Sequence, residues 1–301
     1  MEALREQWLI FISTPFYLIL IVSELLISHW QHLQKYTLRD TISNLYLMLL
    51  NAGVDFLFRL VFYLAFFNFC FSHRFINWQV GIPYWMALVV AEDFLYYWLH
   101  RFDHVIRFFW AAHVTHHSSE QYNFTVGFRS SVFQPLYRFI YFMPLPLFGF
   151  KPLDIIFVFA ATQIWGIFVH TQLIKKMGIL EYILVTPSHH RVHHASNTKY
   201  LDKNMGMFLI LWDKLFGTFQ AELDEADYEP IRYGLTKNIE KPNPITIIFH
   251  EWNQIMNDVF MPNLTLTQRI KYLFGPPGYS HDGSRKTSEE MRKCLGSSNK
   301  P

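Results

Sequence analysis

Three short segments of this chain are rich in histidine, and their spacing is the first feature that could do chemistry. His100 and His104 stand four residues apart, and the segments 113–117 and 190–194 each carry three histidines in the pattern HxxHH. On a helix, residues three or four apart project from one face, so the imidazoles of each segment would point the same way. Rings that share a face can share a metal ion.

The number and type of these side chains predict a site for two metal ions. Imidazole nitrogens bind zinc, copper, nickel and iron, and a zinc site needs only three or four ligands. Soluble di-iron bundles use glutamate-rich shells with Glu-x-x-His motifs, which this chain lacks, so a nitrogen-rich site for two irons is expected, with zinc left open. Five histidines lack the pattern and are not expected to bind metal: His29, His32, His73, His250 and His281.

The composition indicates a membrane protein with a polar site. Of the 301 residues, 18% are aromatic and only 17% are charged, which is unusual for a soluble domain. Two cysteines, Cys70 and Cys294, cannot build a disulfide framework. The net charge of +2 gives no indication of a nucleic-acid partner.

Apolar segments long enough to cross a bilayer predict the fold. They are residues 8–28, 45–71 and 80–99, followed by a proline-kinked hairpin of 132–150 and 153–169 that turns at 149–152. The first segment has no small-residue cleavage site, so a retained anchor is expected. We predict an all-α integral membrane bundle of about four to five spans, with one catalytic domain over 1–275 and a disordered polar tail over 276–301.

The hairpin also predicts where the histidines meet. Two crossings return the chain to its starting side, so His170 and the segment 190–194 are expected on the same membrane face as the other histidines. Basic residues near span ends favour that side, and the positive-inside rule then makes it cytoplasmic. On the histidine side they are Lys35, Arg39, Arg101, Arg107, Arg129, Lys175 and Lys176, against Arg5, Arg74 and Lys151 on the other.

The HxxxH of His100 and His104, the two HxxHH segments and a following WDKLFGTF are the motifs of a known family. Over about residues 91–219 the chain resembles the fatty acid hydroxylase and sterol desaturase superfamily of integral membrane di-iron oxygenases. EDFLYYWLHR at 92–101, HHSSEQYN at 116–123 and TPSHHRVHH at 186–194 look most like the branch that contains alkylglycerol monooxygenase.

This resemblance implies a monooxygenase that uses dioxygen to hydroxylate a membrane lipid at the carbon next to an ether oxygen. It implies two irons and an external electron donor, with tetrahydrobiopterin or another reductant in that role. A tenth ligand is not expected, because Gly166 and Ile174 stand four residues either side of His170. The implied ligands are His100, His104, His113, His116, His117, His170, His190, His193 and His194.

Two choices within the site remain open to spacing alone. His189 and His190 both precede the final HH pair, but aligning AHVTHHSS (112–119) with HHRVHHAS (189–196) sets His190 over His113 and leaves His189 opposite Ala112. We therefore expect His190 to be the ligand. Asp93, Tyr97 and Asp213 are expected to orient ligand imidazoles through their free N–H groups.

Two other functions stay open. The first is a sterol or fatty acyl hydroxylase or desaturase of the same superfamily. The second is a metal-binding membrane protein without turnover, such as a zinc carrier or sensor.

Overall fold

The chain is all-helical, as the sequence predicts. A computed structural model describes residues 2–298, and no strand occurs in that range. The longer helices are α1 Glu2–Trp30, α2 Leu38–Phe58, α3 Leu64–Ser72, α4 Ile82–Val105, α5 Arg107–His117, α8 Pro152–Phe168 and α11 Pro244–Val259. The shorter ones are α6 Pro135–Phe142, α7 Pro144–Leu147, α9 Pro187–His193, α10 Leu211–Phe216, α12 Leu266–Phe274 and α13 Ser288–Ser298.

Two helical segments of the described chain are long and apolar enough to cross a membrane. They are Phe11–Trp30 in α1 and Leu38–Ser72, in which a π-helical turn at Arg59–Tyr63 joins α2 to α3. Only 17% and 12% of their apolar windows are buried inside the protein. An apolar surface of this size, left open by the protein itself, matches a lipid-covered face.

α4 is the central helix of the bundle. Its residues Tyr84, Leu88, Tyr96 and Leu99 lie in the main hydrophobic core together with side chains of α3, α7 and α8. The predicted span 80–99 is therefore a core helix, and it continues for another turn and a half of chain to Val105. This extension carries His100 and His104 beyond the apolar core.

The predicted hairpin 132–169 forms, but its two halves differ. Pro144 begins α7 directly after α6, so the first half is two short helices, whereas the second half is the single helix α8. Between them Gly149 has φ +89°, and a Cβ there would lie 2.1 Å from the carbonyl oxygen of Ile76. Only glycine fits this turn.

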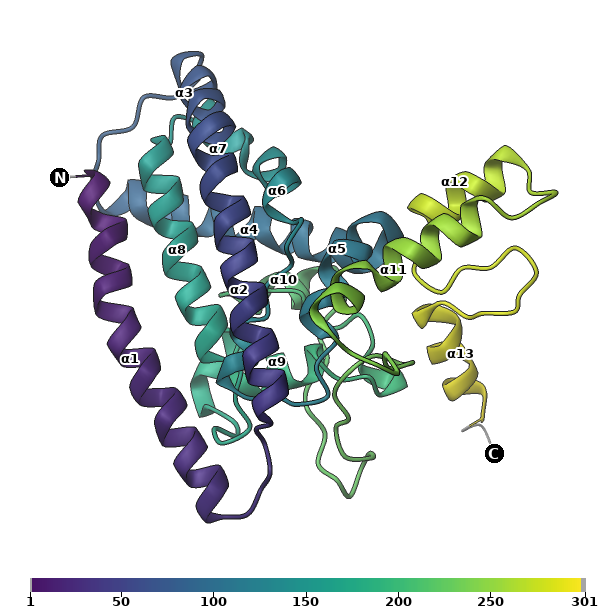
Figure 1. Ribbon diagram of the computed structural model, residues 1–301. Helices are drawn as coiled ribbons and strands as arrows, with labels where there is room; N and C mark the ends of the chain where they lie inside the picture. The colour runs from purple at the N-terminus through teal and green to yellow at the C-terminus, as the bar shows by residue number, and fades with distance from the viewer. Residues whose placement is uncertain (1, 299–301) are drawn as a thin grey trace.

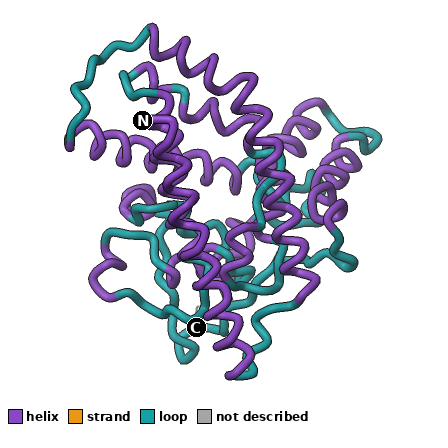
Figure 2. Tube along the Cα trace, turned by 60° about the vertical axis from the view of Figure 1, so that its left-hand side comes forward, coloured by secondary structure: helices purple, strands orange, loops and turns teal. Residues whose placement is uncertain are grey.

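The elements that carry histidine gather at one end of the bundle. Figure 1 shows α1, α2 and α8 side by side along the bundle, with α10 near mid-height, α9 below it, and α11 and α12 extending to one side. Figure 2 shows many of the loop segments at the lower end. The long helices α1, α2 and α8 thus form a scaffold beside the site, and α4, α5 and α9 carry most of its histidines.

The structure corrects the disordered tail predicted for 276–301. Within it, α13 forms at Ser288–Ser298, and residues 299–301 lie outside the described part of the chain. Arg285 forms an ion pair with Asp258 of α11 at 2.8 Å, and Arg292 donates to the carbonyl of Leu201 at 2.5 Å. Local composition could not reveal these partners, because they come from other parts of the chain.

Candidate metal centre

Four parts of the fold bring the histidines together. α4 supplies two of them and α5 supplies three, while His170 follows the end of α8 and the last three lie on α9 or directly after it. The chain makes both HxxHH segments helical, so each presents its rings from one face. Eight of the nine rings are buried, and His116 is partly buried.

The nine predicted histidines divide into two adjacent groups. In each group, one ring nitrogen from every member lies within 4.8 Å of those of all the others. The five-histidine group is His100, His104, His113, His117 and His193, and the four-histidine group is His116, His170, His190 and His194. The groups meet where the rings of His117 and His194 stack, with centroids 4.4 Å apart. Each group draws on segments far apart in the sequence.

Backbone carbonyls decide which nitrogen of each ring faces its group. The Nδ1 atom of His116 donates to the carbonyl of Arg129 at 2.9 Å, and that of His170 donates to the carbonyl of Gly166 at 2.6 Å. A carbonyl can only accept, so Nδ1 carries the proton and Nε2 of the neutral ring has a free lone pair. The same anchoring occurs at His100, through Met205, and at His193, through Lys203.

The Nε2 atoms of neighbouring rings then face one another, and rings whose proton is on Nδ1 have no proton to share between these atoms. Those of His116 and His170 are 3.4 Å apart, and those of His170 and His190 are 3.0 Å apart. Two neutral acceptors cannot form a hydrogen bond, so the 3.4 Å contact is unfavourable unless a cation lies among the lone pairs. The Nε2 atoms of His104 and His193 are buried without any hydrogen-bond partner in the described chain. These donors fit metal ions that prefer imidazole nitrogen.

Burial keeps these rings in the form that binds metal. Removal from water lowers the pKa of His116 to about 4. It lowers the pKa values of the other rings outside the apolar helices well below the ordinary 6.5 for the same reason, with further lowering by neighbouring histidines. Neutral imidazole is the ligand form, so the site is ready for metal at neutral pH.

His189 belongs to neither group. Its Nε2 atom lies 3.2 Å from a carboxylate oxygen of Glu181, and its Nδ1 atom accepts from the backbone N–H of Thr186 at 3.3 Å. These contacts form the cap at the start of α9. The structure therefore places His190, and not His189, beside the other histidines.

The sequence predicts that Asp93, Tyr97 and Asp213 orient the imidazoles, but their hydrogen bonds go to other groups. Asp213 instead accepts from the backbone N–H groups of Met205 and Gly206, both at 2.7 Å. Asp93 binds the N–H groups of Phe208 and Leu209, and Tyr97 contacts Thr218, which donates to Asp213. Together they hold the loop that contains Met205. Because the Met205 carbonyl orients His100, these three residues act on the site indirectly.

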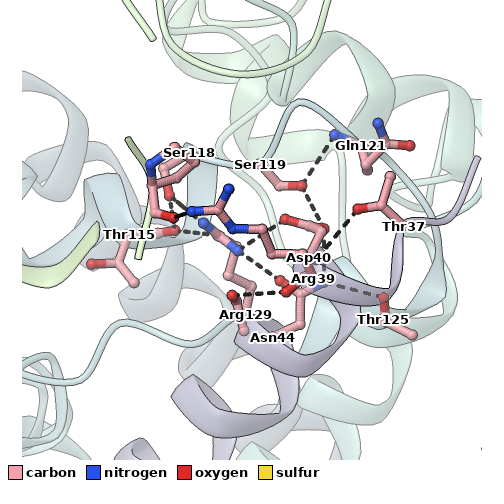
Figure 3. Close-up of polar contacts among 12 residues, drawn as sticks. Thr37, Arg39, Asp40, Asn44, Thr115, Ser118, Ser119, Gln121, Thr125 and Arg129 are labelled. Atoms are coloured by element: carbon pink, nitrogen blue, oxygen red, sulfur yellow. Dashed lines mark hydrogen bonds and ion pairs between the residues drawn. The ribbon is translucent and has the colours of Figure 1, made fainter. Parts of the chain in front are cut away.

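A buried arginine, Arg129, orients a ring of the second histidine segment through its backbone carbonyl. Figure 3 shows Arg129 surrounded by Asp40 and Asn44 of α2 and by Ser118 and Thr115 of the α5 end. Its guanidinium is 1% exposed, and its own carbonyl accepts from His116. The start of α2 thus positions a histidine nearly eighty residues further along the chain. In the sequence, Arg129 is marked only as a basic residue near a span end.

Asp202 and Tyr122 also contact site histidines, and the sequence did not predict either contact. Asp202 lies 3.5 Å from Nδ1 of His104, and the ring of Tyr122 stacks against that of His170 at 5.7 Å. Tyr122 lies within HHSSEQYN, which the resemblance had singled out, whereas no local pattern marks Asp202. Its contact arises from the fold of the loop that follows α9.

Two cavities reach the histidines from different sides. The larger, of about 390 Å³, touches both groups and is bounded by α5, α11 and the segment before α13. The smaller, of about 90 Å³, lies among α2, α4, α6 and α8. His104, His117, His193 and His194 line the larger cavity, whereas His100, His113, His116, His170 and His190 line the smaller. Ligands could approach the centre from two directions.

Comparison with known proteins supports these geometric findings. A family model described as fatty acid hydroxylase matches residues 85–218, which include all nine histidines. The chain is 34% identical to an alkylglycerol monooxygenase of Homo sapiens over 94% of its own length and 63% of that relative's. It is 32% identical to an alkylglycerol monooxygenase of Xenopus tropicalis, covering 89% of this chain and 58% of the relative.

A more distant relative has a different name. A Delta(7)-sterol 5(6)-desaturase of Gibberella zeae is 27% identical over 54% of this chain and 52% of that protein. No solved structure matches the chain. The chain spans less than two thirds of the length of these two alkylglycerol monooxygenases. Residues 85–218, which carry the three histidine segments of this buried centre, match the fatty acid hydroxylase family.

Proposed function

We propose that this protein is a membrane-embedded, non-haem di-iron monooxygenase that uses dioxygen to hydroxylate a lipid C–H bond. The observation that carries the proposal is the division of nine histidines into two adjacent, buried groups whose lone pairs converge. Iron suits imidazole ligands, and two groups match two ions. The five-histidine group would hold one iron and the four-histidine group the other.

The metal would supply chemistry that no side chain here can perform. Iron when bound activates dioxygen for attack on an unactivated C–H bond. The protein's own part is to orient and protect: the carbonyls of Arg129, Gly166, Met205 and Lys203 hold ring orientation through Nδ1. Such partners typically tune metal affinity by about 10–100-fold. Burial excludes water and keeps the rings neutral.

We place the site at the cytoplasmic face of a multi-pass bundle. α1 and the α2–α3 segment have the length and apolar exposure of spans, and we assign α4 and α8 as further crossings because they pack in the same bundle. Both histidine groups lie at one end of it, and the bias of Lys and Arg makes that end cytoplasmic.

The substrate we propose is an alkylglycerol, hydroxylated at the carbon next to the ether oxygen. The names of two relatives that align over most of this chain support this choice. A sterol or fatty acyl substrate is the alternative, favoured by the desaturase relative. Electrons would come from tetrahydrobiopterin or another external reductant.

One experiment tests the metal and the reaction together. Protein purified without oxygen and loaded with iron should hold about two ions per chain and should consume dioxygen when given a reductant and lipid. An alkylglycerol, a sterol and a free fatty acid are offered in parallel, with the product identified by mass spectrometry. A stoichiometry near one ion, or equal turnover with zinc alone, contradicts the di-iron proposal. Metal binding with no turnover of any lipid favours a non-catalytic carrier or sensor.

A further inference from the structure

We propose that α11 and α12 form a hairpin that lies on the surface of the lipid bilayer, with one apolar stripe of each helix immersed at the boundary between headgroups and acyl chains. We call residues 244–274 the interfacial hairpin. The proposal concerns how the protein meets the membrane, and it does not rest on the proposed reaction.

The first observation is an apolar stripe that the protein leaves uncovered. On α11 it consists of Ile245, Phe249, Met256 and Phe260, at intervals of four, seven and four residues, which keeps them on one helical face. On α12 the exposed side chains are Leu266, Ile270 and Phe274, again four residues apart. These seven side chains are between 41% and 73% exposed. An amphipathic helix of this kind favours an apolar–water boundary.

The opposite face of α11 is fastened to the bundle. Ile247 and Ile248 pack in a small core with Leu47 of α2 and Val132. Arg107 of α5 forms ion pairs with Glu251 at 2.7 Å and with Asp258 at 2.6 Å. The helix is therefore held in one orientation, and its apolar stripe points away from the protein.

The interfacial hairpin begins beside the first turn of a candidate membrane span. Arg39, in the first turn of α2, donates a hydrogen bond to the carbonyl of Pro242, two residues before α11. The candidate span Leu38–Ser72 starts at that same turn. Figure 1 shows α11 and α12 extending sideways from the bundle. A helix that leaves the bundle at the end of a span lies at the height of the bilayer surface.

Charge and continuity identify the occupant as lipid. The exposed apolar side chains Ile42, Leu45 and Leu49 lie on α2, the helix whose Leu47 packs against α11. Glu251 and Asp258 are bonded to arginines, so the charges left on and just before the hairpin are mainly basic. They are Lys237, Lys241, Arg269 and Lys271, with Glu240 opposing them. Basic side chains beside an apolar stripe match an anionic leaflet.

The inner face of α11 gives this docking a consequence for the centre. His250, Glu251 and Gln254 line the larger cavity, which also touches His104 and His117. One helix thus separates the bilayer surface from the cavity that reaches the histidines. Docking the hairpin would hold the mouth of that cavity against the lipid.

The test places a nitroxide label on the hairpin of the full-length protein in bilayers of phosphatidylcholine and phosphatidylserine. The exposed Cys294 is first replaced by serine, and the buried Cys70 is kept. Met256→Cys and Phe260→Cys report the stripe, and Asn257→Cys, on an exposed polar position about 100° around the helix from Met256, is the matched control. Accessibility to dioxygen, which dissolves in lipid, is compared with accessibility to a water-soluble nickel chelate.

We expect the labels at 256 and 260 to collide severalfold more with dioxygen than with the chelate, and the label at 257 to show the reverse. Adding Phe249→Glu and Ile270→Glu together should expose the label at 256 to the chelate, because charged side chains are expelled from the apolar layer. Unchanged far-ultraviolet circular dichroism and metal content would show that the double variant is folded. Equal chelate accessibility at 257 and 256 in the unaltered hairpin would overturn the proposal, whatever the protein's activity.

Discussion

The Nε2 atom of His190 lies 3.0 Å from Nε2 of His170, at the centre of the four-histidine group. Its neighbour His189 faces the other way and binds Glu181. The backbone of α9 turns through roughly 100° per residue, so adjacent side chains cannot serve the same group. This difference makes the two histidines separable by mutation.

We expect His190→Ala and His170→Ala to lose bound metal and activity, because each removes a nitrogen aimed into the group. His189→Ala should keep its metal and lose only part of its activity, since it removes one contact of the α9 cap. Metal analysis and turnover measured on all three variants check this. A metal-free His189→Ala beside a metal-replete His190→Ala would show that the assignment is reversed.

Gly127 lies in the short 3-10 helix Phe124–Phe128, which packs closely against the histidine centre. A Cβ at this position would lie 3.2 Å from Nδ1 of His170 and 3.1 Å from the Cα of Ile167. Gly127→Ala should therefore push His170 off its Gly166 carbonyl and destabilise the fold by about 1–3 kcal/mol. Lower metal content at unchanged expression is the expected result.

Gly53→Ala is the matched control for this variant, because a Cβ there meets nothing within 4 Å. It should retain metal and activity. If Gly127→Ala binds metal as well as Gly53→Ala does, the contact with His170 does not constrain the centre.

The proposed topology can be read from single cysteines in a Cys294→Ser background. Glu120→Cys and Glu225→Cys, both exposed at the histidine end, should react with an impermeant maleimide only from the cytoplasmic side. Asn77→Cys, exposed near the Gly149 turn, should react from the opposite side. Labelling of positions 120 and 225 from opposite sides would be incompatible with a single centre.

Acid should destabilise the metal-stripped protein. Burial lowers the pKa of His116 from 6.5 to about 4 in the folded state, so the unfolded chain binds more protons in this interval. Stability is then present above the unfolded pKa and is lost as the pH falls from about 6.5 toward 4. Melting temperatures measured over this range should fall steadily with pH.

His29, an exposed residue of α1, provides the control variant. His29→Gln should leave the pH dependence of the melting temperature unchanged, because it lies outside the buried centre. A melting temperature that stays flat down to pH 4 would mean that the buried rings are already protonated when metal is absent.

Local spacing determined much of this protein in advance. The i, i+3, i+4 pattern selects one helical face, so the ligand candidates within each segment, and the preference for His190 over His189, followed from the sequence. Long apolar runs predicted the helical fold, and the parity of the 132–169 hairpin predicted that all three segments would meet. Residue spacing, the length of an apolar segment and the number of crossings can all be read along the chain. None of them requires knowing which helix packs against which.

Only the tertiary structure decided how nine histidines divide into five and four, because each group mixes rings from different segments. It also decided that carbonyls of Met205 and Arg129 orient the rings, while Asp93, Tyr97 and Asp213 act on the loop behind them. A carbonyl leaves no mark in a sequence, since every residue has one. The order of 276–298 was hidden for the same reason: Asp258 and Leu201, which bind its arginines, lie far away in the chain and close in space.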